Sequence, residues 1–299
     1  MHYIVSIPVD PKLAEFIGKK GSENSITFYN RKADDNVIVG IAPSSIEEKF
    51  YALAECLLIA DQALVSTINL DKLFGEIIVA CSLINKHVIF TNDGNIDQFL
   101  KGIKIESYEI TERDKAIERI LAQKSNREGN VRIDIDKGFP VKGLGTVALG
   151  IVTRGVVKVH DELLHSSGKK AQIRSIQAQD VDIKEAAPGT RVGLVLKGVE
   201  SDEIEKGDIL SNVQVPRAGK ITGEVKMSNI NQEKIQVGFH YYFVSNFSVT
   251  FSTVEKIEGN TVSLRFEKKI PLEINDEFLL IREVSPRIFA SGKVKTVSE

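Results

Sequence analysis

In the first 123 positions, short runs of hydrophobic residues alternate with segments in which hydrophobic residues recur every three or four positions. Short apolar runs rich in β-branched residues predict strands at residues 4–7, 26–29, 37–41, 63–68 and 87–91. Between the last three runs, apolar residues recur at the i, i+3, i+4, i+7 spacing of amphipathic helices: Phe50, Leu53, Ala54, Leu57 and Leu58 in one segment, and Phe74, Ile77, Ile78 and Cys81 in the other. Strands separated by such helices predict a largely parallel sheet with helices on its faces.

The pattern changes after this region. A last helix is expected to begin at Thr111, whose hydroxyl can cap it, and Lys124-Ser125-Asn126 forms a polar stretch suited to a linker. From Val131 onward, short alternating segments are separated by glycines and turn pairs, and a second run of this kind follows Pro216. Many short strands at regular spacing predict closed β-barrels. We therefore expect an α/β domain at residues 1–123 and all-β barrels at residues 128–213 and 214–299.

A glycine- and lysine-containing segment near the N-terminus, Gly18-Lys19-Lys20-Gly21-Ser22, raises the question of a phosphate loop. The motif G-x-x-x-x-G-K-[ST] surrounds nucleotide phosphates with backbone N–H groups, a lysine and a hydroxyl. Leu13 stands where the first glycine is needed, and Lys20 stands where the hydroxyl is needed. We interpret the segment as a helix end at Gly18 followed by a solvated basic turn.

Composition narrows the function classes. Of the 299 residues, 42% are hydrophobic and 27% are charged, as in ordinary soluble globular proteins. The formal net charge of −2 argues against a general polyanion binder, so any nucleic-acid contact must come from a local basic patch. The two cysteines, Cys56 and Cys81, lie within apolar helical patterns, and there is no secretory leader or long apolar run. The sequence therefore predicts a cytoplasmic protein without a membrane partner.

Several motifs follow the linker in a fixed order. Residues 139–147 read FPVKGLGTV, residues 155–161 read GVVKVHD, residues 186–194 read AAPGTRVGL, and residues 206–210 read KGDIL. They closely resemble the second domain of the translational GTPases, with its F-x-V-x-G-x-G-T-V strand pair, A-x-x-G-x-x-V-G-L turn and strand, and closing R-G-D-x-L. The tail IREVSPRIFASGKV, at residues 281–294, resembles the closing strand of that family. The resemblance points to elongation factor Tu, its archaeal counterpart and the selenocysteine-specific elongation factor.

The resemblance implies that the first domain keeps the family's order of elements and loses its nucleotide chemistry. Of the family's Asp-x-Pro-Gly-His motif only Pro43 remains: Ile41 replaces the aspartate that holds magnesium, and Ser45 replaces the histidine that orients water. The degenerate nucleotide-site positions are Lys19, Lys20, Ile41, Ser44, Ser45, Asn92 and Asp93, the last two in place of the guanine-reading Asn-Lys-x-Asp. GTP hydrolysis needs phosphate, metal and water contacts together. We therefore expect a pseudo-GTPase with no enzymatic activity, no cofactor and no metal.

In the resembled family, the second and third domains hold aminoacyl-tRNA. Gln177 falls where elongation factor Tu has an adenosine-contacting glutamate, and a glutamine keeps the hydrogen bonds without the charge. The alternative is an ordinary surface residue at a strand end. Basic residues populate the expected turns and could contact phosphates, or they could be scattered solvated charges: Lys142, Arg154, Lys158, Lys169, Lys170, Arg174 and Arg191. We take Lys142, Arg154, Arg174, Gln177 and Arg191 as the tRNA or ribosome candidates.

Two other features are interpreted structurally. The aromatic run at residues 238–247 can stack on bases, but aromatic residues in strands usually pack, so we expect it to fill a barrel core and its rim. His160 and His165 have no carboxylate or cysteine at ligand spacing, which argues against a metal site.

The sequence therefore favours a GTP-independent translation-factor paralogue that binds tRNA or the ribosome through its barrels. One alternative is an atypical active GTPase for a specialised aminoacyl-tRNA, using residues 18–22 as an unusual loop. The other is a protein-interaction scaffold whose first domain docks a partner.

Overall fold

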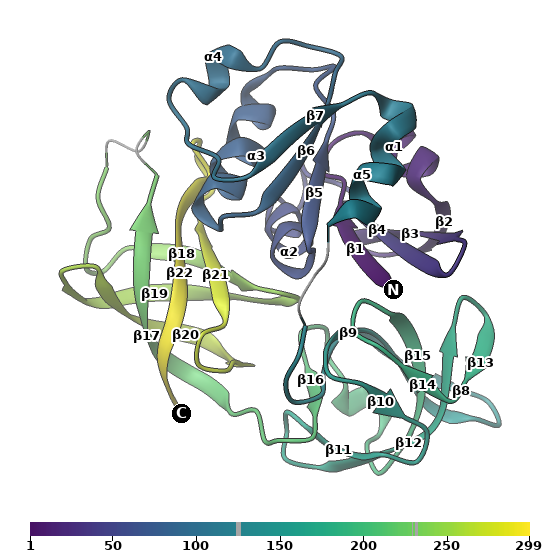
Figure 1. Ribbon diagram of the computed structural model, residues 1–299. Coiled ribbons are helices and arrows are strands. Elements are labelled where there is room, and N and C mark those ends of the chain that lie inside the picture. The colour runs from purple at the N-terminus through teal and green to yellow at the C-terminus, as the bar shows by residue number, and fades with distance from the viewer. Residues whose placement is uncertain (124–126, 229, 231–232) are drawn as a thin grey trace.

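The computed structural model describes residues 1–123, 127–228, 230 and 233–299, and Figure 1 shows three domains along the chain. The first domain contains a seven-stranded sheet in the order β2-β3-β4-β1-β5-β6-β7. Five adjacent strands run parallel to one another: β1 (His2–Ser6), β4 (Asn36–Pro43), β5 (Gln62–Val65), β6 (His87–Thr91) and β7 (Tyr108–Thr111). Strand β3 (Ile26–Ala33) runs antiparallel to both β2 (Lys19–Glu23) and β4. The expected largely parallel sheet is confirmed.

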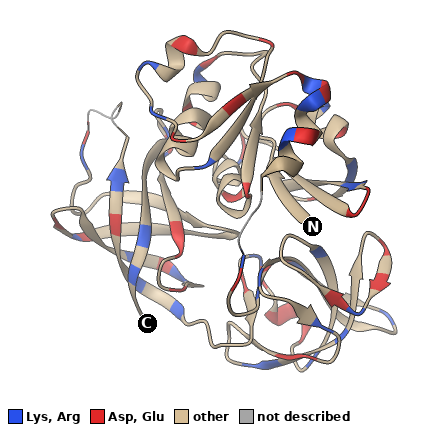
Figure 2. Cartoon of the chain, in the orientation of Figure 1, with Lys and Arg blue, Asp and Glu red and all other residues tan. Residues whose placement is uncertain are grey.

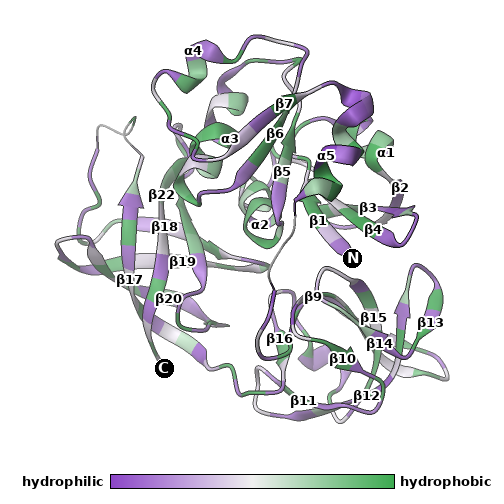
Figure 3. Cartoon of the chain, viewed as in Figure 1, coloured by the Kyte–Doolittle hydropathy of each residue, from purple (hydrophilic) through white to green (hydrophobic). Residues whose placement is uncertain are grey.

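Helices cover both faces of this sheet. On one face, α1 (Pro11–Ile17) and α5 (Ala116–Ala122) pack against alternate residues of β1. On the other face lie α2 (Tyr51–Ile59) and α3 (Lys72–Leu83), while the short α4 (Asp97–Leu100) follows β6. Figure 3 shows hydrophobic residues along the central strands and along α2, where these layers meet.

The basic segment after α1 is a strand rather than a turn. Asp10 caps α1 by accepting the Leu13 N–H at 2.9 Å, and the helix ends at Gly18, as expected. Gly18 is extended rather than left-handed, and a Cβ there would lie 2.8 Å from the Asn30 backbone. Lys19 and Lys20 then pair with β3 at the edge of the sheet. Every residue of β2 is exposed, so no apolar alternation marked it in the sequence.

The helix expected at Thr111 begins later. Thr111 is the last residue of β7 and is buried, whereas Glu112 precedes the 3₁₀ turn η1 (Arg113–Lys115) that leads into α5. A four-residue strand at a sheet edge, with exposed Tyr108 and Ile110, is too short to show a clear period. The expected linker at residues 124–126 lies outside the described residues.

Two closed β-barrels follow, as expected. The second domain contains β8 (Arg132–Val141), β9 (Gly145–Arg154), β10 (Val157–Lys158), β11 (Glu162–His165), β12 (Lys170–Ala178), β13 (Val181–Ile183), β14 (Glu185–Ala186), β15 (Arg191–Lys197), the turn η2 (Ser201–Glu203) and β16 (Ile209–Ser211). Six strands run in the order β11-β16-β8-β9-β15-β12 and close through β11–β12. The third barrel has the order β17-β20-β19-β18-β21-β22.

The strands of the third barrel are β17 (Arg217–Met227), β18 (His240–Ser245), β19 (Ser248–Glu258), β20 (Thr261–Pro271), β21 (Glu277–Ile281) and β22 (Ile288–Ser298). The aromatic run behaves mainly as expected, because Tyr241 and Phe243 are buried in the barrel core. Tyr242, between them, points outward and is half-buried. Phe247 packs against the first domain.

Helix α2 connects all three domains. Residues 52–59 are all buried, so the helix is covered on every side rather than on the one face that its pattern predicts. Leu53 and Leu57 belong to a core that includes Leu279 and Ile288 of the third domain. On another side, Cys56 shares a core with Ile151 of the second domain and Phe247 of the third. This packing ties the first domain to both barrels through apolar contacts.

Candidate functional site

The carboxyl ends of the parallel strands form the first candidate site. Consecutive crossovers place β4 and β5 on opposite sides of β1, and in open α/β sheets ligands bind at such a switch point. Four polar side chains follow these strands: Asp10 after β1, Ser66 after β5, Asp93 after β6 and Arg113 after β7. We call these four residues the strand-end cluster.

Arg113 bridges the strand-end cluster. Its Nη2 donates to Asp10 Oδ2 at 2.7 Å and to Ser66 Oγ at 3.0 Å, and its Nε donates to Asp93 Oδ2 at 3.1 Å. The other oxygen of Asp10 accepts the Leu13 N–H at the start of α1. One guanidinium therefore holds together the ends of β1, β5 and β6, and a carboxylate occupies the start of the first helix.

These contacts favour the charged forms of Asp10 and Arg113 and satisfy hydrogen bonds within the cluster. Burial would raise the pKa of the Asp10 carboxyl, but hydrogen bonds from Leu13 and Arg113 outweigh it and lower the pKa below its usual value. Burial likewise opposes the charge of Arg113, yet its bonds to Asp10 and Asp93 raise its pKa. The N–H groups of Asp93 and Gly94 donate to Thr67 Oγ1 at 3.0 Å each, so these backbone donors are already used.

The predicted nucleotide-site positions are dispersed over the first domain. Lys19 and Lys20 are exposed on β2, with Lys20 paired to Glu23 at 2.9 Å, and neither is among the residues that follow the parallel strands. Ile41 is fully buried in the core shared with both barrels. Ser44 Oγ lies 2.7 Å from Thr27 Oγ1, Ser45 Oγ accepts from Glu48 N–H at 3.4 Å, and Asn92 is exposed. Only Asp93 belongs to the strand-end cluster.

Sequence reasoning missed Asp10 and Arg113. Asp10-Pro11 directly follows the first strand, and an aspartate before a proline is a helix-start signal that marks Asp10 as a cap. Arg113 carries no comparable signal, because its partner Asp10 lies 103 positions away.

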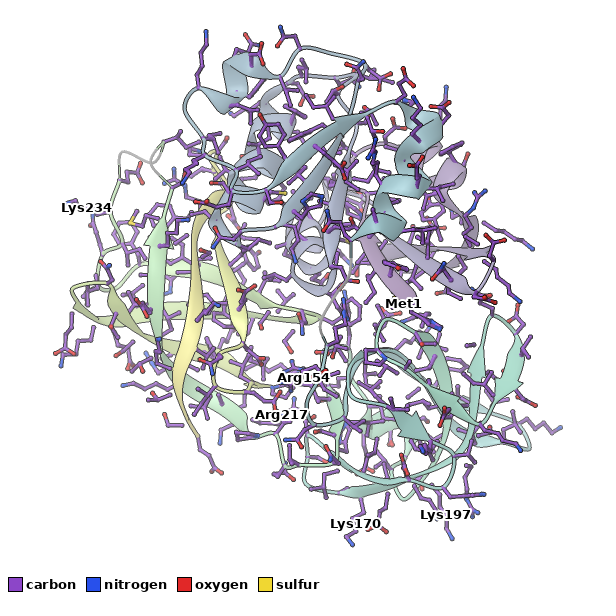
Figure 4. The ribbon with its side chains drawn as sticks, viewed as in Figure 1. Met1, Arg154, Lys170, Lys197, Arg217 and Lys234 are labelled. Atoms are coloured by element: carbon purple, nitrogen blue, oxygen red, sulfur yellow. The ribbon has the colours of Figure 1, made fainter. Side chains whose placement is uncertain are left out.

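Two basic candidates in the second domain are not free surface residues. Arg191 Nη2 donates to Asp136 at 2.6 Å, and its guanidinium lies 3.8 Å from the Phe28 ring centroid of the first domain. Its side chain is only 11% exposed, and burial lowers its pKa. Arg154, which lies between the two barrels in Figure 4, pairs with Glu273 of the third domain. Both arginines join domains, so their charges are engaged by contacts within the chain.

The remaining candidates lie on the outer face of the second barrel. Lys142, in the β8–β9 turn, and Arg174, in β12, are exposed and form no ion pair among the residues that the structure describes. The register places Thr146 beside Leu196 and Leu196 beside Ile173, so the turn and Arg174 lie toward the same end of the sheet. Lys158, Lys169 and Lys170 instead pair with Glu185, Glu203 and Glu162. Figure 2 accordingly shows acidic and basic segments interspersed over both barrels.

Gln177 is exposed on the same face, and its Nε2 donates to Asp182 Oδ1 at 2.8 Å. Its cross-strand neighbour in β15 is Gly193, which presents no side chain there. Beside them, Val147 and Val195 face each other across β9 and β15. Both lie outside the barrel core and are half-buried. Gln177 thus borders a small apolar surface that sequence reasoning did not identify.

The chain carries no metal centre or membrane helix in its described part. No group of three His, Cys, Asp or Glu side chains that could hold a metal ion occurs among the described residues. His165 is buried, with Nε2 3.1 Å from Asp208 and Nδ1 2.8 Å from Ser167 Oγ. Both cysteines are buried and free, and burial raises the pKa of the Cys81 thiol to about 12. None of the described helices is long and apolar enough to cross a bilayer.

Comparison with known proteins identifies the family. The family model for elongation factor Tu domain 2 matches residues 145–211. An uncharacterized protein of Methanocaldococcus jannaschii is 32% identical over 93% of this chain and 94% of its own length. The selenocysteine-specific elongation factor of Haemophilus influenzae is 25% identical over 97% of this chain. The chain belongs to the translational GTPase family.

Within this family, the chain spans only 47% of the length of the Haemophilus influenzae factor. The crystal structure of translation elongation factor SelB from Methanococcus maripaludis, in complex with the GTP analogue GppNHp, aligns with 99% of this chain and 79% of that one. The TM-score is 0.82 at 20% sequence identity, so this likeness establishes the fold. The α/β domain followed by two barrels is thus the architecture of translational GTPases.

Proposed function

We propose that the chain is a nucleotide-independent translational GTPase paralogue that binds tRNA or the ribosome through its β-barrels. The strand-end cluster carries the first half of this proposal. Phosphate binding at a helix start needs free N–H donors and positive charge, whereas Asp10 supplies a carboxylate that engages the Leu13 N–H. The residues present therefore do not fit a GTP–magnesium complex, and no hydrolytic step is assigned to them.

The surroundings of the cluster support the same conclusion. A pocket of about 490 Å³ adjoins Asp10, and its wall contains a second carboxylate, Asp71, with Lys12 as its basic side chain. Two carboxylates repel phosphates at this place. Ile41, at the position of the family's magnesium-holding aspartate, has no exposed surface and contributes to the joint with both barrels.

Calorimetric titration with GTP and GDP in the presence of magnesium tests the nucleotide half. We expect no saturable heat with either nucleotide and no GTP turnover, with or without ribosomes. Micromolar binding of either nucleotide would establish the atypical GTPase instead. Turnover that disappears in the variant Lys19→Ala or Lys20→Ala would assign it to residues 18–22.

The outer face of the second barrel supports the RNA half. Lys142 and Arg174 are exposed and form no ion pair within the described residues, and Gln177 offers amide donors and an acceptor beside the apolar pair Val147 and Val195. Charge serves the phosphates, while an amide next to an apolar surface suits a nucleobase edge and ring. We infer that the terminal adenosine of a tRNA binds at Gln177, with the acceptor strand passing Lys142 and Arg174.

Salt-dependent tRNA binding tests this assignment. The logarithmic salt slope should be about 0.7 to 0.9 for each neutralised phosphate, and the variant Lys142→Ala/Arg174→Ala should flatten it by about one to two. The matched control Lys169→Ala/Lys170→Ala removes two lysines that are already paired to glutamates, so it should have a smaller effect. Gln177→Ala should reduce discrimination for the terminal adenosine and leave the slope unchanged. Equal effects of both double variants would contradict the proposed RNA face.

A further inference from the structure

Three aromatic side chains form a row where the first and third domains meet. Tyr51, at the start of α2, has its ring centroid 5.9 Å from that of Tyr242 in β18. The Tyr242 ring lies 4.0 Å from that of Phe251, its cross-strand partner in β19. Strands β18 and β19 extend beneath α2 in Figure 1. We call Tyr51, Tyr242 and Phe251 the aromatic ledge.

The aromatic ledge is open to solvent. Phe251 is 39% exposed, and Tyr51 and Tyr242 are half-buried, although the core of the same barrel fully buries Phe243 and Phe278. The barrel therefore does not need the outer faces of these rings for its own packing. Exposed aromatic rings that lie together in this way are available to a binding partner.

Carboxylates flank the aromatic ledge in the sequence and in the strand register. Glu47 and Glu48 lie in the turn that leads into Tyr51, and Glu283 lies with Oε1 3.5 Å from the Tyr242 hydroxyl. Glu267 follows Phe266, which pairs with Ser252, the residue after Phe251. We call Glu47, Glu48, Glu267 and Glu283 the acidic rim; all are exposed, and none forms an ion pair within the described part of the chain. Lys49 is the basic side chain in the first of these turns.

A neighbouring contact at the same seam shows which chemistry such a surface accepts. The guanidinium carbon of Arg287 lies 3.6 Å from the Phe50 ring centroid, while its Nη2 donates to Glu76 Oε2 at 2.6 Å. An aromatic face and a carboxylate together thus hold one arginine. The aromatic ledge and the acidic rim repeat these two components on the surface. The first residue of the ledge, Tyr51, directly follows Phe50 in the chain.

We propose that the aromatic ledge and the acidic rim dock an arginine-bearing basic segment of a protein partner. Guanidinium groups stack on aromatic faces and pair with carboxylates in one geometry. The four carboxylates of the rim repel a phosphate backbone, so this face is distinct from the RNA face on the second barrel. The docking goes beyond the proposed RNA binding and does not depend on it.

Fluorescence anisotropy with a labelled Gly-Arg repeat peptide tests the proposal on the full-length chain. The peptide should bind, and a matched Gly-Lys peptide of equal charge should bind about two- to five-fold more weakly, because lysine stacks less well on the rings. The variant Phe251→Ser should weaken binding of the arginine peptide by a similar factor. Glu283→Gln should also weaken binding of the arginine peptide and should leave the other interactions of the chain unchanged.

Matched controls separate the ledge from general effects. Phe239→Ser removes an aromatic ring of the same barrel that is 49% exposed and lies outside the ledge, and it should leave binding unchanged. Glu258→Gln removes an exposed carboxylate that pairs with Lys256 and should likewise have no effect. Circular dichroism should show that each variant remains folded. If Phe251→Ser does not fold, Tyr242→Leu gives a second test of the ledge.

Three outcomes would overturn the proposal. They are no peptide binding, equal loss with Phe239→Ser and Phe251→Ser, and equal affinity for the arginine and lysine peptides. Displacement of the peptide by an oligouridylate in a Phe251-dependent manner would also overturn it, by identifying the ledge as a nucleic-acid surface. Loss of tRNA binding in Lys142→Ala/Arg174→Ala with peptide binding retained would show that the two faces act separately.

Discussion

Replacing Lys206 by methionine should loosen the joint between the three domains. Lys206 Nζ, from the second domain, lies 2.6 Å from Glu55 Oε1 and 2.8 Å from Oε2, and it donates to Ser25 Oγ at 2.7 Å. It also lies 5.7 Å from the Phe247 ring centroid of the third domain. Glu55 is the one charged residue of α2 and is fully buried. Removing its partner should cost about 3–5 kcal/mol at pH 8, because a buried charge is left uncompensated.

The cost should depend on pH in a defined direction. Burial raises the pKa of Glu55 from 4.5 to about 7, with Lys206 opposing the rise. Because the folded value exceeds the unfolded one, the protonated carboxyl stabilises the folded chain below about pH 4.5, and this contribution is lost as the pH rises through about 7. This difference in pKa changes the free energy of unfolding by roughly 3 kcal/mol, at about 1.4 kcal/mol for each pKa unit.

Without Lys206, the pKa of Glu55 rises further, so the destabilisation should be large at pH 8 and should shrink toward pH 5. Urea unfolding followed by circular dichroism at the two pH values measures it. Glu55→Gln should flatten the pH dependence between about 4.5 and 7, and Glu55→Gln/Lys206→Met should recover most of the stability lost at pH 8. An equal cost of Lys206→Met at both pH values would refute this account of the joint, as would a double variant no more stable than Lys206→Met.

Two substitutions test other parts of the fold. Arg113→Ala should lower stability by about 1 kcal/mol, since its partly exposed contacts are screened by solvent, and NMR titration should show the pKa of Asp10 rising; an unchanged pKa would contradict the bridging role. Gly292→Ala places a Cβ 2.3 Å from the Phe278 ring and should cost about 1–3 kcal/mol in thermal melts. The control Gly102→Ala meets no atom within 4 Å and should be neutral; equal melting temperatures of the two variants would be inconsistent with the close packing at Gly292.

The fold followed from local patterns to a large extent. Apolar runs and helical spacing marked the longer strands and helices of the first domain, and glycine-bounded short segments marked both barrels. The errors fall on sheet edges. Strand β2 has no buried residue, and β7 has only Thr111 fully buried, so neither carries a period that hydrophobicity can show. Helix α2 was expected to bury one face, because its pattern cannot show that a barrel covers each of its other sides.

The sequence by itself determined the order of domains, the family and the identity of the residues at each motif position, because these depend on local spacing and residue type. Only the tertiary structure decided which charges are free. Lys142 and Arg154 look alike as basic residues of the second barrel, yet Arg154 meets Glu273, which lies 119 positions away. Glu55 and Lys206 are separated by 151 positions. Electrostatic contacts act through space, so the side chains that remain available for a partner are set by how distant segments pack.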